Sequence, residues 1–192
     1  MEKRNIKALR IIRILLSKPD GSLTKYRIAK LAGCSAPWVI EHIRNLELKG
    51  IVKNTQVLNP DRIRDYYISM MPKIRHFEAY IPNPEKFLRE SKMPYALTTY
   101  AAENHTAHHL FPSRWDVYIS ENDIPEWKKT LISNGPVGKG NVRIIPTYDQ
   151  NILKEAETVE GLKIVLRPLL MIDLKKEGGV CMEAYSLMEK NV

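Results

Sequence analysis

Three histidines near the middle of the chain are the residues best suited to hold a metal ion. His105 and His109 are four positions apart, which on a helix would turn both imidazoles to one face and let them share a zinc ion; His108 lies between them. The order is not that of a metalloprotease, because Thr106 and Ala107 stand where the catalytic glutamate belongs, and no third ligand is close in sequence. We therefore predict a polar helix face or a partner surface, with no metal site and no cofactor.

The other patterns typical of catalysis are incomplete. The glycine-rich segment 135–141 precedes a predicted strand and lacks the spacing of a phosphate-binding loop, which needs a following helix N-terminus. We interpret it as a loop, one that could contact nucleic acid. Asp116 is the only acid well placed for a nuclease, and we expect it to pair with Arg114 or line a surface, because the neighbouring predicted strand offers Arg143 and no carboxylate. The chain is therefore predicted not to be an enzyme.

Positive charge is concentrated at the start of the chain. The 192 residues carry a net charge of +8; residues 1–75 have 16 lysines and arginines against 6 acids, a net of +10, whereas residues 76–192 have 14 against 16, a net of −2. A basic segment joined to a near-neutral one is typical of a polyanion-binding head. Cys34 and Cys181 have neither disulfide nor metal spacing, and neither a signal peptide nor a membrane span is evident, so we expect a cytoplasmic protein that does not bind membranes.

The basic segment is predicted to form three helices and a hairpin. Apolar residues predict a first helix that stops at 19–21, and Thr24 is placed to cap a second helix that ends at Gly33. Ser35 would cap a third helix, with Gly50 as its stop, and 51–58 would form a short hairpin with a polar tip at 54–55. The residues expected to face inward are Ile28, Ala29, Leu31, Val39, Ile43 and Leu46.

Residues 35–52 resemble the winged helix-turn-helix of transcriptional regulators, whose pattern S-x-x-x-V-x-x-x-[LI]-x-x-L-x-x-x-G-[LI]-V they match throughout. In such a unit the second helix lies in the major groove of DNA and the wing touches the backbone or minor groove. Trp38 has two interpretations, contact with thymine methyl groups or burial in the core, and specificity would rest partly on Arg44, His42 and DNA shape. The residues expected to contact DNA are Lys25, Arg27, Ser35, Ala36, Pro37, Trp38, Glu41, His42, Arg44, Asn45, Lys53, Asn54 and Gln56.

Beyond the hairpin the element types alternate, which predicts the α+β class. We expect a winged helix-turn-helix over 1–58, a connecting helix over 59–75 capped by Asn59, and a mixed α/β domain over 76–192. In that domain strands are predicted at 76–81, 114–119, 141–146 and 162–165, and helices at 84–92, 98–110, 124–132, 168–177 and 180–188.

Four segments that follow the basic region resemble the AbiEi-type antitoxin and transcriptional-regulator family of type IV toxin–antitoxin systems. They are 94–105, 114–120, 140–146 and 166–188, the last being the most specific through Pro168, Asp173, Leu174, Gly178 and Gly179. Where the family often has a basic residue after the double glycine, this chain has Val180. The resemblance implies a DNA-binding head that represses its own operon, and a nucleotidyltransferase-like toxin as partner.

Our leading hypothesis is a cytoplasmic DNA-binding regulator of the antitoxin type that acts on operator DNA with paired half-sites, which favours a homodimer because one recognition helix reads few base pairs. Two alternatives stay open. One is a nucleic-acid-processing enzyme with a winged-helix targeting domain, and the other is a regulator that senses a ligand in its α/β domain.

Overall fold

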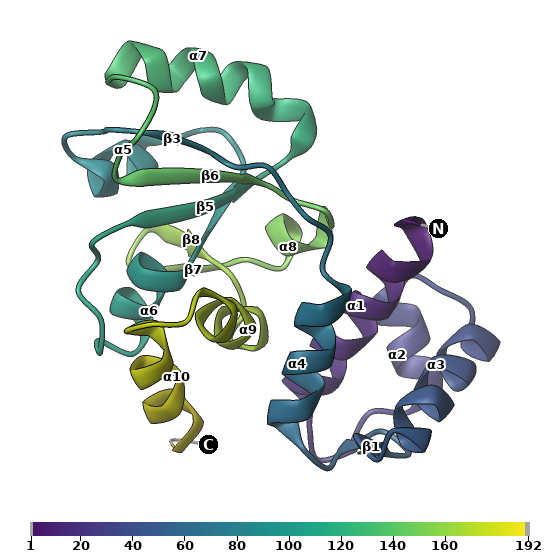
Figure 1. The fold of residues 1–192 in the computed structure, drawn as a ribbon. Coiled ribbons are helices and arrows are strands. Elements are labelled where there is room, and N and C mark those ends of the chain that lie inside the picture. Colours follow the sequence, from purple (N-terminus) through teal and green to yellow (C-terminus); the bar gives the residue numbers. More distant parts are fainter. Residues whose placement is uncertain (1, 191–192) are drawn as a thin grey trace. The chain divides into compact units, whose positions relative to one another are not determined.

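The computed structural model describes residues 2–190 and has the predicted α+β class (Figure 1). The chain divides into two compact units, Met1–Pro72 and Lys73–Val192, which we call the N-terminal and C-terminal units. Among residues 2–190, no helix combines the length and apolarity that crossing a lipid bilayer requires.

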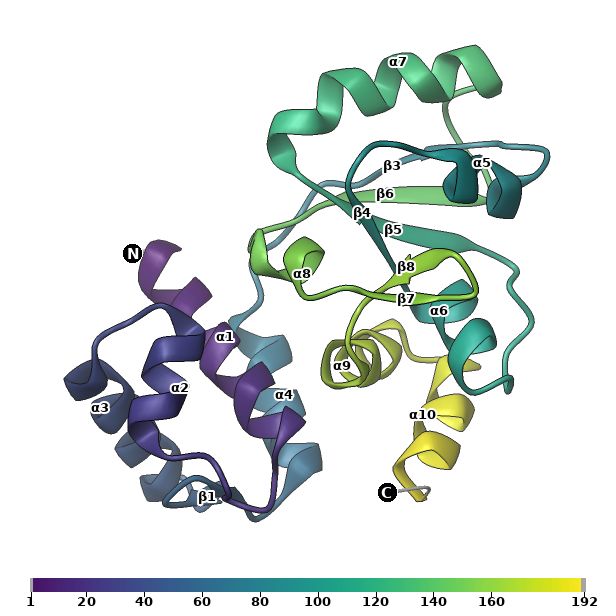
Figure 2. The same ribbon diagram turned by 180° about the vertical axis from the view of Figure 1, so that it is seen from behind.

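The N-terminal unit consists of four helices and a two-stranded antiparallel hairpin. Its elements are α1 (Glu2–Ser17), α2 (Lys25–Ala32), α3 (Ala36–Leu48), β1 (Val52–Lys53), β2 (Gln56–Val57) and α4 (Pro60–Met70). Helices α1 and α4 pack together, with Ile63 and Tyr67 fully buried, and the three residues between α2 and α3 form a tight turn. The two strands of the hairpin lie directly after α3 (Figure 2).

The helix boundaries of this unit follow from their caps. Thr24 Oγ1 accepts a hydrogen bond from the Arg27 N–H, and Asn59 caps α4 in the same way through the Arg62 N–H. Gly33 has a φ of 63°, the left-handed conformation expected at the end of α2. The predicted caps at Thr24, Gly33 and Asn59 are therefore confirmed. Ser35 occupies the N-cap position of α3, but its side chain makes no capping hydrogen bond.

One prediction for this unit is wrong: Leu31 is 42% exposed, and Ala32 takes the inward position at the end of α2. The predicted hairpin is present with Asn54 and Thr55 at its tip, and Thr55 is buried there with its hydroxyl donating to the Gly21 carbonyl. The segment before α2 runs beside β2, where the Val57 N–H donates to the Pro19 carbonyl, so the hairpin is anchored to the unit along one side.

The C-terminal unit is built on a six-stranded mixed sheet in the order β3-β6-β5-β4-β8-β7. Pairs β5–β6 and β4–β8 are parallel and the others antiparallel. The strands are β3 (Phe77–Ala79), β4 (Tyr95–Thr98), β5 (Trp115–Ile119), β6 (Val142–Pro146), β7 (Glu157–Val159) and β8 (Leu162–Ile164); the helices are α5 (Pro84–Glu90), α6 (Thr99–Thr106), α7 (Ile124–Asn134), α8 (Asn151–Lys154), α9 (Arg167–Glu177) and α10 (Cys181–Lys190), with a short 3₁₀ turn, η1 (Glu121–Asp123).

Helices cover both faces of this sheet, α5 and α7 on one side and α6 and α9 on the other, with α10 packed against α6 and α9 (Figures 1 and 2). Side chains of β4 point alternately to the two faces of the sheet. On one face the ring of Tyr95 packs edge to face against Trp127 of α7, and on the other Thr98 donates a hydrogen bond to Asp173 of α9. All five residues of β5 are buried, as a central strand covered on both faces requires.

The helix predicted over 98–110 is present but shorter, and the strand that precedes it was not predicted. Residues 95–98 form the buried strand β4, and α6 starts directly at Thr99 without a loop between them. The helix then ends at Thr106, and His108 follows with a φ of 62°. Strand β7 and helix α8 also lie where the sequence pattern predicted no element, while the remaining predicted strands and helices are present with ends shifted by a few residues.

Candidate nucleic-acid interface

Helix α3 has one face in the core of the N-terminal unit and one in solvent. Val39, Ile43 and Leu46 are fully buried, as predicted from their spacing. Pro37 and Arg44 are exposed on the opposite face. The last turn of α3 also holds the hairpin, because the Glu47 carboxylate accepts a hydrogen bond of 2.6 Å from the Asn54 N–H. The recognition surface predicted from sequence is thus presented by a helix tied at its end to the hairpin.

Every residue predicted to contact DNA is at least partly accessible, though only some of them lie together. Trp38, Glu41, His42 and Asn45 line one hollow of α3. The first turn of α2 carries Lys25 and Arg27, and the hairpin carries Lys53, Asn54 and Gln56. The other four, Ser35, Ala36, Pro37 and Arg44, lie on α3 or at its N-cap. Residues exposed to solvent are Arg27, Ser35, Pro37, Glu41, Arg44, Asn45, Lys53, Asn54 and Gln56, and those half-buried are Lys25, Ala36, Trp38 and His42.

The hollow on α3 has a volume of about 160 Å³. Two of its walls are aromatic: the rings of Trp38 and His42 stack nearly parallel, at 3°, with centroids 5.5 Å apart. His42 Nε2 is buried and has no hydrogen-bond partner among the described residues. Burial lowers the pKa of His42 below its ordinary value of 6.5, so the imidazole is neutral at pH 7. Trp38 itself is half-buried, so part of its side chain stays accessible in the hollow.

Tyr26 is a candidate contact that sequence reasoning missed. Its side chain is 75% exposed in the first turn of α2, between Lys25 and Arg27. A tyrosine hydroxyl can donate to a phosphate oxygen, and the two neighbours supply positive charge. The sequence did contain a signal, because Ile28, Ala29 and Ala32 define the buried face of α2 and leave position 26 on the outer face.

Three arginines of the N-terminal unit are engaged in the fold and add little to a DNA-binding surface. Arg13 is buried and donates to the Tyr67 hydroxyl, and Arg64 is buried on α4. Arg10 donates to the carbonyl of Ala32 at 2.8 Å, at the C-terminal end of α2. The charge that can meet a polyanion is thus smaller than the net charge of the segment, and it comes from exposed residues such as Arg27 and Lys53.

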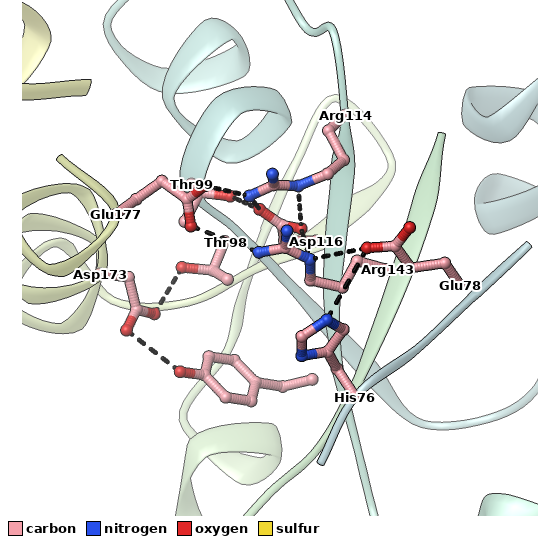
Figure 3. Close-up of polar contacts among 10 residues, drawn as sticks. His76, Glu78, Thr98, Thr99, Arg114, Asp116, Arg143, Asp173 and Glu177 are labelled. Carbon is pink, nitrogen blue, oxygen red and sulfur yellow. Dashed lines mark hydrogen bonds and ion pairs between the residues drawn. The ribbon is translucent and has the colours of Figure 1, made fainter. Parts of the chain in front are cut away.

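The C-terminal unit contains a second polar cluster, where two arginines surround Asp116 of β5 (Figure 3). Arg114 donates to both carboxylate oxygens of Asp116, at 2.7 and 2.8 Å, and Arg143 of β6 lies 3.6 Å away. Glu177 of α9 pairs with both arginines. Thr99 donates its hydroxyl to the same aspartate from a backbone with a φ of 51°, a strained conformation for a β-branched residue. The ion pair between Asp116 and Arg114 confirms the expectation that Asp116 pairs with this arginine.

Asp173 of α9 lies beside this cluster in a buried site of its own (Figure 3). It accepts hydrogen bonds from the Thr98 hydroxyl at 2.6 Å and the Tyr118 hydroxyl at 3.1 Å. Burial raises its pKa from 3.8 to about 6, because desolvation of the carboxylate outweighs the hydrogen bonds that stabilise it.

The three histidines do not share a helix face, which corrects the sequence-based placement. His105 is in α6 and its Nδ1 lies 2.9 Å from Glu160, whereas His108 and His109 follow the helix end. The N–H groups of His109 and Leu110 donate to the buried Glu103 carboxylate, which closes this end of α6. Within the described part of the chain, no three His, Cys, Asp or Glu side chains come together in a way that could hold a metal ion.

No family model, curated protein or solved structure matches this chain. A function is therefore inferred from the surface of the N-terminal unit and from the sequence patterns above.

Proposed function

We propose that the N-terminal unit is a winged helix-turn-helix that binds double-stranded DNA, and that the chain is a transcriptional regulator. The order of elements supports this, with a three-residue turn between α2 and α3 and an antiparallel hairpin after α3. In the proposed complex α3 enters the major groove with its N-terminal residues first, and the hairpin follows the sugar-phosphate backbone.

The observation that carries the proposal is the position of cations on both sides of α3. Lys25 and Arg27 begin the helix before it, and Lys53 lies on the hairpin after it, with Arg27 and Lys53 exposed to solvent. Such residues pair with phosphates and release counterions, which gives affinity without sequence preference. The exposed side of α3 would then be held against the base edges, where sequence is read.

For the C-terminal unit we propose protein contacts, following the resemblance to antitoxin-type regulators. Its partner would be a second copy of the chain, since one recognition helix reads few base pairs, or a nucleotidyltransferase-like toxin. A cytoplasmic location accords with this role. The closed ion pairs around Asp116 favour a structural function for that residue, because both neighbouring guanidinium groups are already paired with carboxylates.

Binding to the DNA upstream of the coding sequence, compared with scrambled DNA, tests the proposal. Fluorescence anisotropy over a salt series should show tighter binding to the upstream duplex and a fall in affinity as salt increases. Replacing both Arg27 and Lys53 by alanine should weaken binding to both duplexes and lower the slope of log K against log salt by about 2, roughly one for each phosphate that is no longer neutralised.

The matched control is the double replacement of Lys92 and Lys154 by alanine, which removes the same charge from exposed positions of the C-terminal unit. It should leave the salt slope unchanged. Equal losses of affinity in the two double variants would show that binding reflects overall charge and would contradict the proposal. Equal, weak binding of the wild type to both duplexes would contradict it as well.

A further inference from the structure

The hollow on α3 contains two stacked aromatic rings, which binding to the phosphates of DNA does not require. Trp38 is the largest side chain on the accessible part of this helix, and its ring is held parallel to that of His42. The two residues are one helical turn apart, so the stack is fixed by the helix itself. The two ring faces can pack against an apolar group, and a neutral imidazole adds no charge to them. Glu41 and Asn45 supply the polar part of the lining.

The size and surroundings of the hollow indicate what it can accept. At about 160 Å³ it is smaller than the usual pocket for a small molecule, which begins near ~300 Å³. A group that protrudes from a larger ligand fits better. The exposed cations of α2 and the hairpin make that larger ligand a polyanion. In the major groove the one apolar group that protrudes from the bases is the 5-methyl group of thymine.

We propose that Trp38 and His42 form the surface on which this chain recognises the 5-methyl group of thymine in the major groove of DNA. The inference rests on the proposed function of the N-terminal unit and names what its recognition helix reads. Asn45 lines the same hollow, and its amide can bond both N6 and N7 of an adenine. The base pairs read by this part of α3 are therefore A·T pairs.

The test starts from a duplex selected by the full-length protein out of a random library. Each thymine of that duplex is then replaced in turn by uracil, which removes the methyl group and leaves base pairing intact. At one or two positions the wild type should bind the uracil duplex about three- to fivefold more weakly, the effect of losing one buried methyl group. At the other thymines the replacement should have no effect.

Variants connect this effect to the aromatic stack. W38A should bind the thymine and uracil duplexes equally at the sensitive positions, whereas W38F, which keeps an aromatic face, should keep part of the preference. Lys53→Ala is the control, because it should weaken binding to both duplexes by the same factor. Retained circular dichroism and salt-dependent binding to unselected DNA would show that W38A is folded, as expected for a half-exposed residue.

Two results would overturn the inference and leave the proposed function standing. One is selective DNA binding by the wild type with no sensitivity to uracil at any position. The other is a uracil effect that persists at full size in W38A. Absence of any DNA binding by the wild type would instead reject the proposed function, and the inference with it.

Discussion

Replacing Asp173 by asparagine should change how the stability of the C-terminal unit depends on pH. The folded state raises the pKa of this buried carboxyl to about 6 from an ordinary value of 3.8. Between these two values the folded chain binds more protons than the unfolded chain, so stability falls as pH rises through this range. The contribution is fully present below pH 3.8 and is lost above pH 6. The ionised carboxylate of Asp173 therefore lowers the free energy of unfolding by about 3 kcal/mol at neutral pH, because each unit of pKa shift corresponds to about 1.4 kcal/mol.

Asparagine has nearly the same shape and does not titrate, so its carbonyl can still accept a hydrogen bond from Thr98 or Tyr118. Most of the cost is incurred between pH 4 and pH 6. Raising the pH from 5 to 7.5 should therefore destabilise the wild type relative to D173N by about 1 kcal/mol. Taking the difference between the two proteins cancels the titration of the other carboxylates, provided that they behave alike in both.

Urea unfolding followed by tryptophan fluorescence measures this difference. A Trp38→Phe background leaves Trp115 and Trp127, both buried in the C-terminal unit, as the only fluorophores of their kind. Equal differences between wild type and D173N at pH 5 and 7.5 would refute the reasoning. A wild type that gains stability relative to D173N as pH rises would show that the hydroxyl donors outweigh desolvation and lower the pKa of Asp173.

Four further substitutions test the packing and the helix caps, each by urea unfolding. Asp116→Ala should destabilise the C-terminal unit by about 3 kcal/mol, because it leaves two arginines short of a buried partner, and a loss below about 1 kcal/mol would mean that they re-pair at no cost. Gly140→Ala should cost about 3 kcal/mol or more, since its Cβ would lie 2.1 Å from the carbonyl group of Ala79; a fully stable variant would show that the loop moves freely. Thr24→Ala should cost about 1 kcal/mol and Ser35→Ala less than about 0.5, because only Thr24 makes a capping hydrogen bond; equal losses would contradict this distinction.

The parts of the fold that the sequence predicted correctly are those fixed by neighbours in the chain. Thr24 and Asn59 cap helices through hydrogen bonds to residues three positions on, and Gly33 ends α2 because it takes a left-handed backbone easily. The boundary between β4 and α6 depends on Thr99, whose positive φ no local rule predicts for a β-branched side chain. That conformation accompanies its hydrogen bond to Asp116, 17 positions away, so tertiary structure decides it.

The candidate interface was predictable to a similar extent. Helical spacing alone separates the buried face of α3 from the accessible one, and it places Trp38 and His42 one turn apart. Spacing could not show that the two rings stack, or that a hollow forms beside them. Nor could it exclude Arg13 from the available cations, because its partner Tyr67 is 54 positions away.

The charges of α3 favour a division between affinity and selectivity in the proposed complex. The helix carries one arginine, Arg44, against two glutamates, Glu41 and Glu47, so it has no net attraction for phosphates. Attraction must come from α2 and the hairpin, and it is screened by salt because the residues involved are exposed. Contacts of Trp38 and His42 with a methyl group involve no charge and release no counterion. Affinity for selected and scrambled DNA should therefore fall together as salt increases, while their ratio, set by α3, stays nearly constant.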